Sequence, residues 1–164
     1  MLISRAGLVK ASERLARLRE EQHGKAHEAG DLFRTGGDMW HDNPSFYDAV
    51  AEREKLREET ERLGHLLSDV DLQFIDDQSD NGTICPGYEV EVEYSDGDRF
   101  SFVILGSVEQ DLAAGVISCE TPIAKALLGH KAGDKVNYCG GDNRLISVSV
   151  LTAHRWEGLE NPDR

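Results

Sequence analysis

The stretch TGGDMWHDNPSF, residues 35–46, interrupts sequence that is otherwise typical of long helices. Gly36 and Gly37 supply the left-handed residue that commonly ends a helix. Asn43 is a good N-cap, and Pro44 fits the first helical position, where its missing N–H costs nothing. The stretch therefore predicts that one helix ends and a second begins within a few residues, which is the signature of a helical hairpin.

The flanking sequence has the periodicity that such a hairpin needs. The first helix is predicted from Ser4, a suitable N-cap, to about Thr35, and the second from Pro44 to about residue 72. Apolar or small residues recur at steps of three and four, with charged residues between them. These seam positions are Leu8, Ala11, Leu15, Leu18, Ala26, Ala29 and Phe33, then Phe46, Ala49, Arg53, Leu56, Thr60, Leu63, Leu67 and Val70. Two such helices joined by a short loop must run antiparallel, as a hairpin about 45 Å long.

The second half of the chain changes period. Residues 88–94 alternate strictly, with Val90 and Val92 on one face, and Asp96-Gly97 predicts a tight turn into a strand over 99–105. Two more strands are predicted at 136–139 and 145–151. Thr121-Pro122 precedes a short helix, residues 123–128.

The predicted fold class is therefore α+β, an N-terminal antiparallel coiled-coil hairpin followed by a small antiparallel-sheet domain with one short helix. The predicted hairpin covers residues 1–76 with an acidic tip at 35–45. A linker at 77–82, the sheet domain at 83–155 and a frayed tail at 156–164 follow.

The composition limits the function. The formal charge is −13, which leaves no basic footprint for binding nucleic acid alone, so any nucleic acid is expected to be presented by a basic partner. No apolar run is long enough to span a bilayer, and the N-terminus lacks a signal-peptide core. Cys85, Cys119 and Cys139 have neither disulfide-framework nor zinc-site spacing. A reduced cytoplasm is the expected location.

Candidate sites outside the tip are weak. His23 and His27 have a spacing at which two imidazoles can share a metal, with Glu28 beside them, but no third ligand is spaced to join them. An exposed polar face is the preferred interpretation. The glutamates at 89, 91 and 93 are best explained as the solvent side of a half-buried strand. No nucleophile elbow, P-loop or dinucleotide fingerprint occurs, so no self-contained catalytic site is predicted.

The tip carries the chemistry that remains. Asp38 and Asp42 flank Met39, Trp40 and His41. Aspartate is a common turn residue, and both acids favour the positive end of the second helix. That interpretation leaves the large apolar side chains unexplained, and exposed apolar clusters often mark a contact surface. Two carboxylates are too few to hold Mg²⁺ alone, but they could complete a metal site that lacks ligands elsewhere.

Several motifs then resemble the bacterial Gre transcript-cleavage factors. In the first half these are Gly37-Asp38, Asp42-Asn43 and the sequence QFID at 73–76. In the second half GVIS at 115–118, followed by TPIAKALLG at 121–129, is very similar to the family's ISxxSPIAxALxG segment. KAGD at 131–134 fits the KxxGD that follows. The resemblance spans almost the whole chain.

The resemblance implies a function without an enzyme activity of the chain's own. It implies an FKBP-like second domain that docks at the secondary channel of RNA polymerase, while the hairpin brings Asp38 and Asp42 to the polymerase active site. There the two acids share Mg²⁺ with the polymerase and help it hydrolyse backtracked RNA. The protein is expected to be a monomer that has no cofactor of its own and does not bind a membrane. It is expected to contact nucleic acid only inside the elongation complex. The implied polymerase contacts are Met39, Trp40, His41, Asn43, Ser118, Thr121 and Pro122.

The tip also departs from the family pattern GDxxENAEY. Its two acids are four residues apart instead of three, and the second is Asp42 instead of Glu. Catalytic geometry tolerates little misplacement, since a 1 Å error can cost about 10²-fold. A Gre homologue that occupies the channel and inhibits transcription is therefore the alternative. An FKBP-like adaptor or prolyl isomerase is an alternative of another class.

Overall fold

The computed structural model of the chain describes residues 1–35, 44–68, 71–78, 80–141 and 144–159. The chain divides into two compact units, the hairpin unit Lys10–Val70 and the sheet unit, which combines Met1–Val9 with Asp71–Arg164. Among the described helices, none is both long and apolar enough to cross a membrane.

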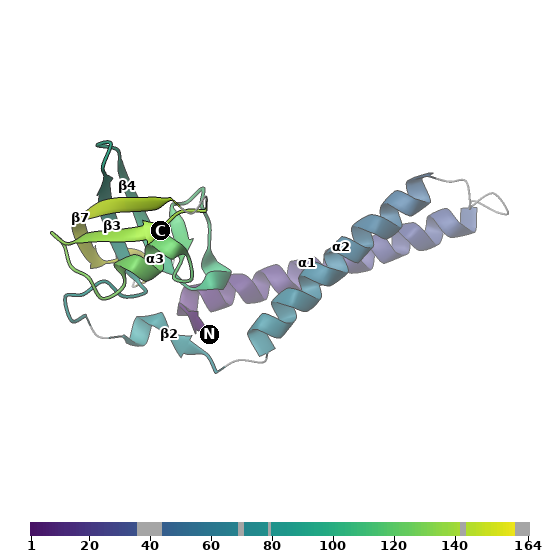
Figure 1. Cartoon of the computed structure of the whole chain (residues 1–164). Coiled ribbons are helices and arrows are strands. Elements are labelled where there is room, and N and C mark those ends of the chain that lie inside the picture. The colour runs from purple at the N-terminus through teal and green to yellow at the C-terminus, as the bar shows by residue number, and fades with distance from the viewer. Residues whose placement is uncertain (36–43, 69–70, 79, 142–143, 160–164) are drawn as a thin grey trace. The chain divides into compact units, whose positions relative to one another are not determined.

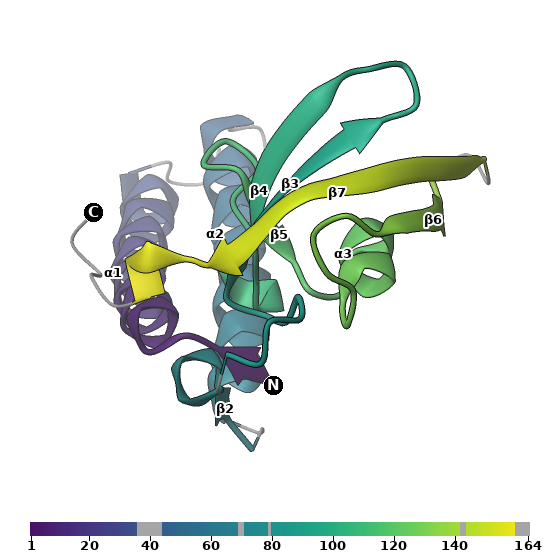
Figure 2. The same ribbon diagram turned by 90° about the vertical axis from the view of Figure 1, so that its left-hand side faces the viewer.

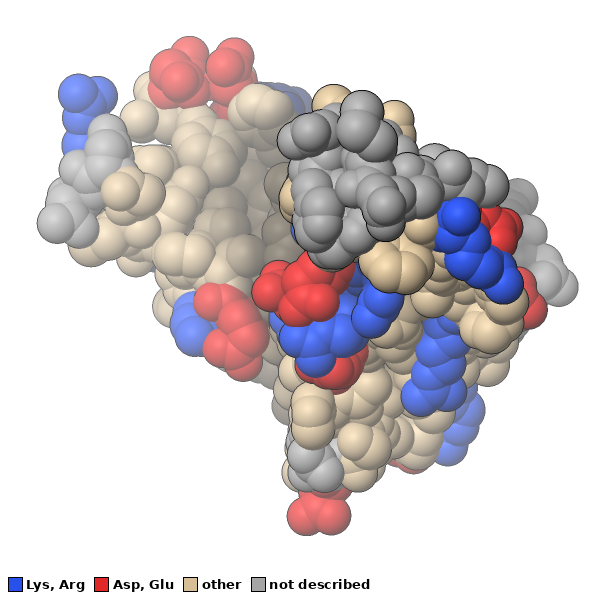
Figure 3. Space-filling model, turned by 90° about the vertical axis from the view of Figure 1, so that its right-hand side faces the viewer, with Lys and Arg blue, Asp and Glu red and all other residues tan. Residues whose placement is uncertain are grey.

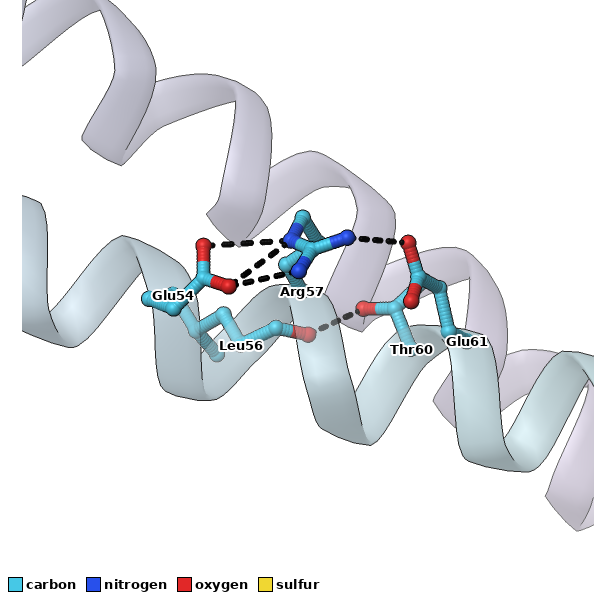
Figure 4. A network of polar contacts seen from close by, with 5 residues as sticks. All are labelled: Glu54, Leu56, Arg57, Thr60 and Glu61. Carbon is cyan, nitrogen blue, oxygen red and sulfur yellow. Dashed lines mark hydrogen bonds and ion pairs between the residues drawn. The ribbon is translucent and has the colours of Figure 1, made fainter.

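The predicted hairpin is confirmed. Helix α1 spans Arg5–Thr35 and helix α2 spans Pro44–Ser68, and the two lie side by side in opposite directions (Figure 1). The seam places Ala11 and Leu18 of α1, and Ala49, Leu63 and Thr60 of α2, in the buried set. The Thr60 hydroxyl donates to the Leu56 carbonyl at 2.6 Å, so this polar seam residue is satisfied within its own helix (Figure 4).

The helix starts follow the predicted capping chemistry. Ser4 is the N-cap of α1, because its Oγ accepts a hydrogen bond from the Gly7 N–H at 2.8 Å. Helix α2 begins at Pro44, the first-turn position that suits proline. Asn43, the predicted cap of α2, lies outside the described residues.

The outer face of the hairpin is covered by paired charges. Arg57 lies between Glu54 and Glu61, at 2.6 and 2.8 Å (Figure 4), and Glu54 holds the pKa of Arg57 above its ordinary value. Arg14 of α1 reaches Glu59 of α2 at 2.5 Å. On the face shown in Figure 3, basic and acidic side chains lie beside one another. Exposed pairs of this kind stabilise little individually, so their main effect is to keep a long two-helix shaft solvated.

The sheet unit contains a five-stranded sheet with the order β5-β4-β3-β7-β6 (Figure 2). All neighbouring strands are antiparallel except β4 and β5, which are parallel. The strands are β3 (Tyr88–Tyr94), β4 (Arg99–Leu105), β5 (Val116–Ser118), β6 (Lys135–Cys139) and β7 (Leu145–Arg155), and the short helix is α3 (Pro122–Leu127). The structure thus confirms the predicted α+β class, with a mostly antiparallel sheet.

The main core lies between the sheet and α3. Val90 and Val92 are fully buried, as their alternation with glutamates predicts, and Ala124 and Leu127 of α3 are fully buried in the same cluster. A second cluster contains Ile75, Val103, Leu105, Val116 and Leu159.

Three features differ from the sequence prediction. Strand β5 and the short parallel pair β1 (Leu2–Ile3) and β2 (Gln73–Phe74) were not predicted, because two or three residues cannot display an alternation. Strand β7 continues to Arg155, whose guanidinium donates to the Asp76 carbonyl at 2.8 Å.

The prediction of a frayed tail from residue 156 was wrong as far as Leu159. That side chain is only 8% exposed and packs in the second cluster, with Trp156 half-buried against it. Gly87 permits this packing, since it has φ +99° and a Cβ there would lie 2.8 Å from Leu159.

Candidate functional site

The predicted tip residues connect the two helices of the hairpin unit. Asp38, Met39, Trp40, His41, Asp42 and Asn43 all lie outside the described residues. Helix α1 ends at Thr35 and α2 begins at Pro44, so both acids belong to the connection between them. Asp42 is two residues before the first residue of α2, where the positive end of the helix dipole favours a negative charge.

An aromatic cluster flanks this connection on both helices. The ring of Phe33 in α1 lies 6.3 Å from that of Phe46 in α2, and Phe46 lies 5.7 Å from Tyr47. Phe33 and Tyr47 are each about half exposed, at 50% and 51%. The heptad spacing predicted Phe33 and Phe46 as seam residues but did not predict a role for Tyr47. The overlooked signal was the adjacent pair Phe46-Tyr47 in the first turn of α2, where only one of the two can face the partner helix.

The second predicted site is the turn that starts α3. Ser118 is only 3% exposed, and its carbonyl accepts from both the backbone N–H and the hydroxyl of Thr121, at 3.0 and 2.8 Å. The Ser118 Oγ accepts from the Glu120 N–H at 3.1 Å. Thr121 caps α3 through Oγ1, which accepts from the Ala124 N–H at 3.4 Å. These polar groups are therefore used to build the turn and to fix the direction of α3.

Of the predicted contacts Ser118, Thr121 and Pro122, Pro122 alone is classed as exposed, and its exposed neighbours Glu120 and Lys125 were not predicted. Pro122 is exposed, while Glu120 and Lys125 form an ion pair at 2.7 Å. We call these three residues the α3 surface. Cys119 is buried, and burial, reinforced by the charge of Glu120, raises the pKa of its thiol, which makes it a poor nucleophile. The signal for Glu120 and Lys125 was present, because both are charged residues within an otherwise apolar motif.

Replacing Thr121 by alanine is expected to lower the free energy of unfolding of the sheet unit by about 1 kcal/mol, because the N-cap acceptor of α3 is lost. Thr121→Ser keeps the hydroxyl and is expected to stay near the wild-type value. Urea unfolding followed by circular dichroism measures both. An alanine variant as stable as the serine variant would show that the hydroxyl does not cap the helix.

Glu89 and Glu93 of β3 each lie next to one basic side chain of a neighbouring strand. His154 Nε2 lies 3.6 Å from Glu89 on the outer face of the sheet, and Glu93 pairs with Arg99 at 2.9 Å. Within the parts of the chain that the structure describes, no group of three or more His, Cys, Asp or Glu side chains could hold a metal ion. Glu89 and Glu93 therefore behave as polar residues on the solvent side of the sheet.

The chain is similar to proteins named as transcription elongation factors. The C-terminal domain of the transcription elongation factors GreA and GreB matches residues 78–155. GreA of Staphylococcus aureus is 30% identical over 153 residues, covering 90% of this chain and 94% of that protein. GreA of Oenococcus oeni is 44% identical over 59 residues, 36% of each protein. The GreA factor homolog 1 protein of Thermus thermophilus is a solved structure with 23% identity and a TM-score of 0.43, covering 94% of this chain and 98% of that one.

Proposed function

Since the chain belongs to the GreA/GreB family of transcription elongation factors, we propose that it binds bacterial RNA polymerase at the secondary channel and stimulates hydrolysis of backtracked RNA. The observation that carries this proposal is the position of Asp38 and Asp42 in the connection between the two helices of a long hairpin. The chain itself is then no enzyme, since the nuclease is the polymerase, and it acts in the cytoplasm.

The tip acids supply charge that the polymerase active site lacks. Two carboxylates do not satisfy the six oxygen ligands of Mg²⁺, so Asp38 and Asp42 act only together with ligands from the polymerase. A magnesium ion held in this way stabilises the attacking and leaving oxygens of a phosphodiester. The chain holds both acids on one arm, where they orient the ion and a water molecule.

The sheet unit supplies the docking surface in this proposal. Pro122, Glu120 and Lys125 make up the exposed α3 surface, and Thr121 and Ser118 hold it in place from beneath. Because the chain carries a net charge of −13, its affinity for the elongation complex comes from the protein, and RNA is met only inside the channel.

The test is a transcript-cleavage assay. Stalled, backtracked polymerase complexes with 3′-labelled RNA are incubated with Mg²⁺ and the full-length protein. Release of short 3′ fragments at a rate above that of the polymerase alone is expected, and the cleaved complexes resume elongation when nucleotides are added. Fragment release at the basal rate, with elongation unaffected, would contradict the proposal.

The second candidate is an inhibitor that occupies the same channel, and the four-residue spacing of the acids favours it. The connection holds Met39, Trp40 and His41 between Asp38 and Asp42, and these bulky side chains could obstruct the channel instead of presenting the metal. An inhibitor slows elongation without releasing fragments. Trp40→Ala is then expected to relieve the inhibition, and unchanged inhibition in that variant would remove the main support for this candidate.

A further inference from the structure

Two histidines on α1 have their ring nitrogens in direct contact. His23 and His27 are one helical turn apart, and their Nε2 atoms are 3.1 Å from each other. The rings meet edge to face, with centroids 4.6 Å apart. Both side chains are exposed. The two nitrogens therefore lie close enough together, on the surface of the hairpin unit, to contact one ion.

This separation suits two ligands of one metal ion. Zinc–imidazole bonds are about 2.0–2.1 Å long, so nitrogens 3.1 Å apart subtend an angle of about 100° at a shared ion. That angle lies between the octahedral and the tetrahedral value. Imidazole is a preferred ligand of zinc, nickel and copper.

The lysine nearest the histidine pair is already paired with carboxylates, while two arginines lie beside the pair. Lys25, the nearest ammonium in the sequence, is turned to the carboxylates of Glu28 and Glu52, at 2.9 and 2.7 Å. Arg19 and Arg53 line an open hollow beside His23. Two guanidinium groups there favour an anionic ligand, such as chloride or a carboxylate, in the coordination positions that the two imidazoles leave open.

We propose that His23 and His27 form a two-imidazole site for a divalent first-row transition metal ion, with zinc as the representative ion. The site spans Gly24, a residue that weakens a helix by about 1 kcal/mol relative to alanine. A metal held by residues i and i+4 closes that turn from outside, so occupation stabilises the turn of α1 that contains Gly24.

The experiment is a calorimetric titration of the full-length protein with Zn²⁺, in a buffer without metal-binding components. One ion per chain is expected. His23→Gln and His27→Gln are each expected to weaken binding by about tenfold or more, because one ligand of two is lost. His65→Gln is the matched control, since it removes an exposed histidine from the other helix of the hairpin, and it is expected to leave the affinity within about twofold.

The imidazole resonances give an independent readout. Zn²⁺ is expected to shift the side-chain signals of His23 and His27 together, at the same concentration. If the pair is only a hydrogen bond between neutral imidazoles, no saturable binding occurs and the proposal is overturned. It is overturned equally if only one of the two glutamine variants weakens binding, or if neither does.

Discussion

Replacing Glu109 by alanine is expected to lower the free energy of unfolding of the sheet unit by about 3 kcal/mol. The carboxylate accepts three hydrogen bonds, from the Ser4 N–H at 2.9 Å, from the Ser4 hydroxyl, and from the Gly106 N–H at 3.3 Å. Ser4 is only 2% exposed, so alanine at position 109 leaves its N–H buried without a partner. Hydrogen bonds to charged groups contribute about 1.5–3 kcal/mol each, and water entering the vacated space recovers part of that loss.

The Glu109 carboxylate is tightly packed against the backbone near Gly7, and Gly106 is tightly packed against the Leu2 carbonyl. A Cβ on Gly7 would lie 2.1 Å from the Glu109 carboxylate, and a Cβ on Gly106 would lie 2.1 Å from the Leu2 carbonyl. Position 106 therefore excludes any larger residue, and a side chain at position 7 would displace the Glu109 carboxylate. The carboxylate holds the first turn of α1, and with it β1, against the turn that follows β4.

Urea unfolding measures the effect, followed by Trp156 fluorescence in a Trp40→Phe background so that only the sheet unit reports. Glu109→Gln keeps one acceptor oxygen without the charge and is expected to fall between alanine and wild type. Glu120→Ala removes an exposed glutamate of an ion pair and is expected to cost less than about 0.5 kcal/mol. A Glu109→Ala variant within about 1 kcal/mol of wild type would show that water replaces the carboxylate.

The Glu109 link also shows where prediction from sequence reaches its limit. The hairpin and strands β3 and β4 were predictable, because Leu18, Leu63, Val90 and Val92 repeat with the period of the element that buries them. Ser4 and Glu109 are 105 positions apart, and no local pattern relates them. Ser4 was correctly predicted as the N-cap of α1. The hydrogen bond from its hydroxyl to Glu109 depends on how the chain folds back, and no local pattern predicts it.

In the candidate site, too, features that depend on local sequence were predictable and features that depend on distant segments were not. The TPIAKALLG motif predicted the start of α3, since Thr121 and Pro122 act through neighbours within three residues. It could not predict that Ser118 is buried, because that burial depends on the pairing of β5 with β4. The Phe33–Phe46 contact likewise depends on the register of the two helices, which a seam of steps of three and four constrains only loosely.

The largest change in activity is expected at the tip. Asp38→Ala is expected to lower the rate of fragment release by about 100-fold, because a carboxylate shared with the polymerase magnesium is lost and misplacement of about 1 Å already costs that much. Asp38→Asn is the matched variant, since it keeps the size of the side chain and removes the charge. If the negative charge of the carboxylate on the metal is what matters, Asp38→Asn is expected to release fragments as slowly as Asp38→Ala. Binding is measured separately, by competition with labelled wild-type protein for polymerase, and is expected to be unchanged in both variants.

Asp42 tests whether spacing limits the chemistry. Asp42→Glu extends the second carboxylate by one methylene, toward the acid found in the resembling family pattern. If the chain stimulates cleavage with a carboxylate that falls short, this variant is expected to release fragments faster than wild type, while Asp42→Ala releases almost none. If the chain is an inhibitor, neither substitution produces fragments, and Trp40 determines the slowing of elongation. Cleavage that proceeds at the wild-type rate in both Asp38→Ala and Asp42→Ala would contradict any role of the tip acids, because no other pair of carboxylates lies in the connection between α1 and α2.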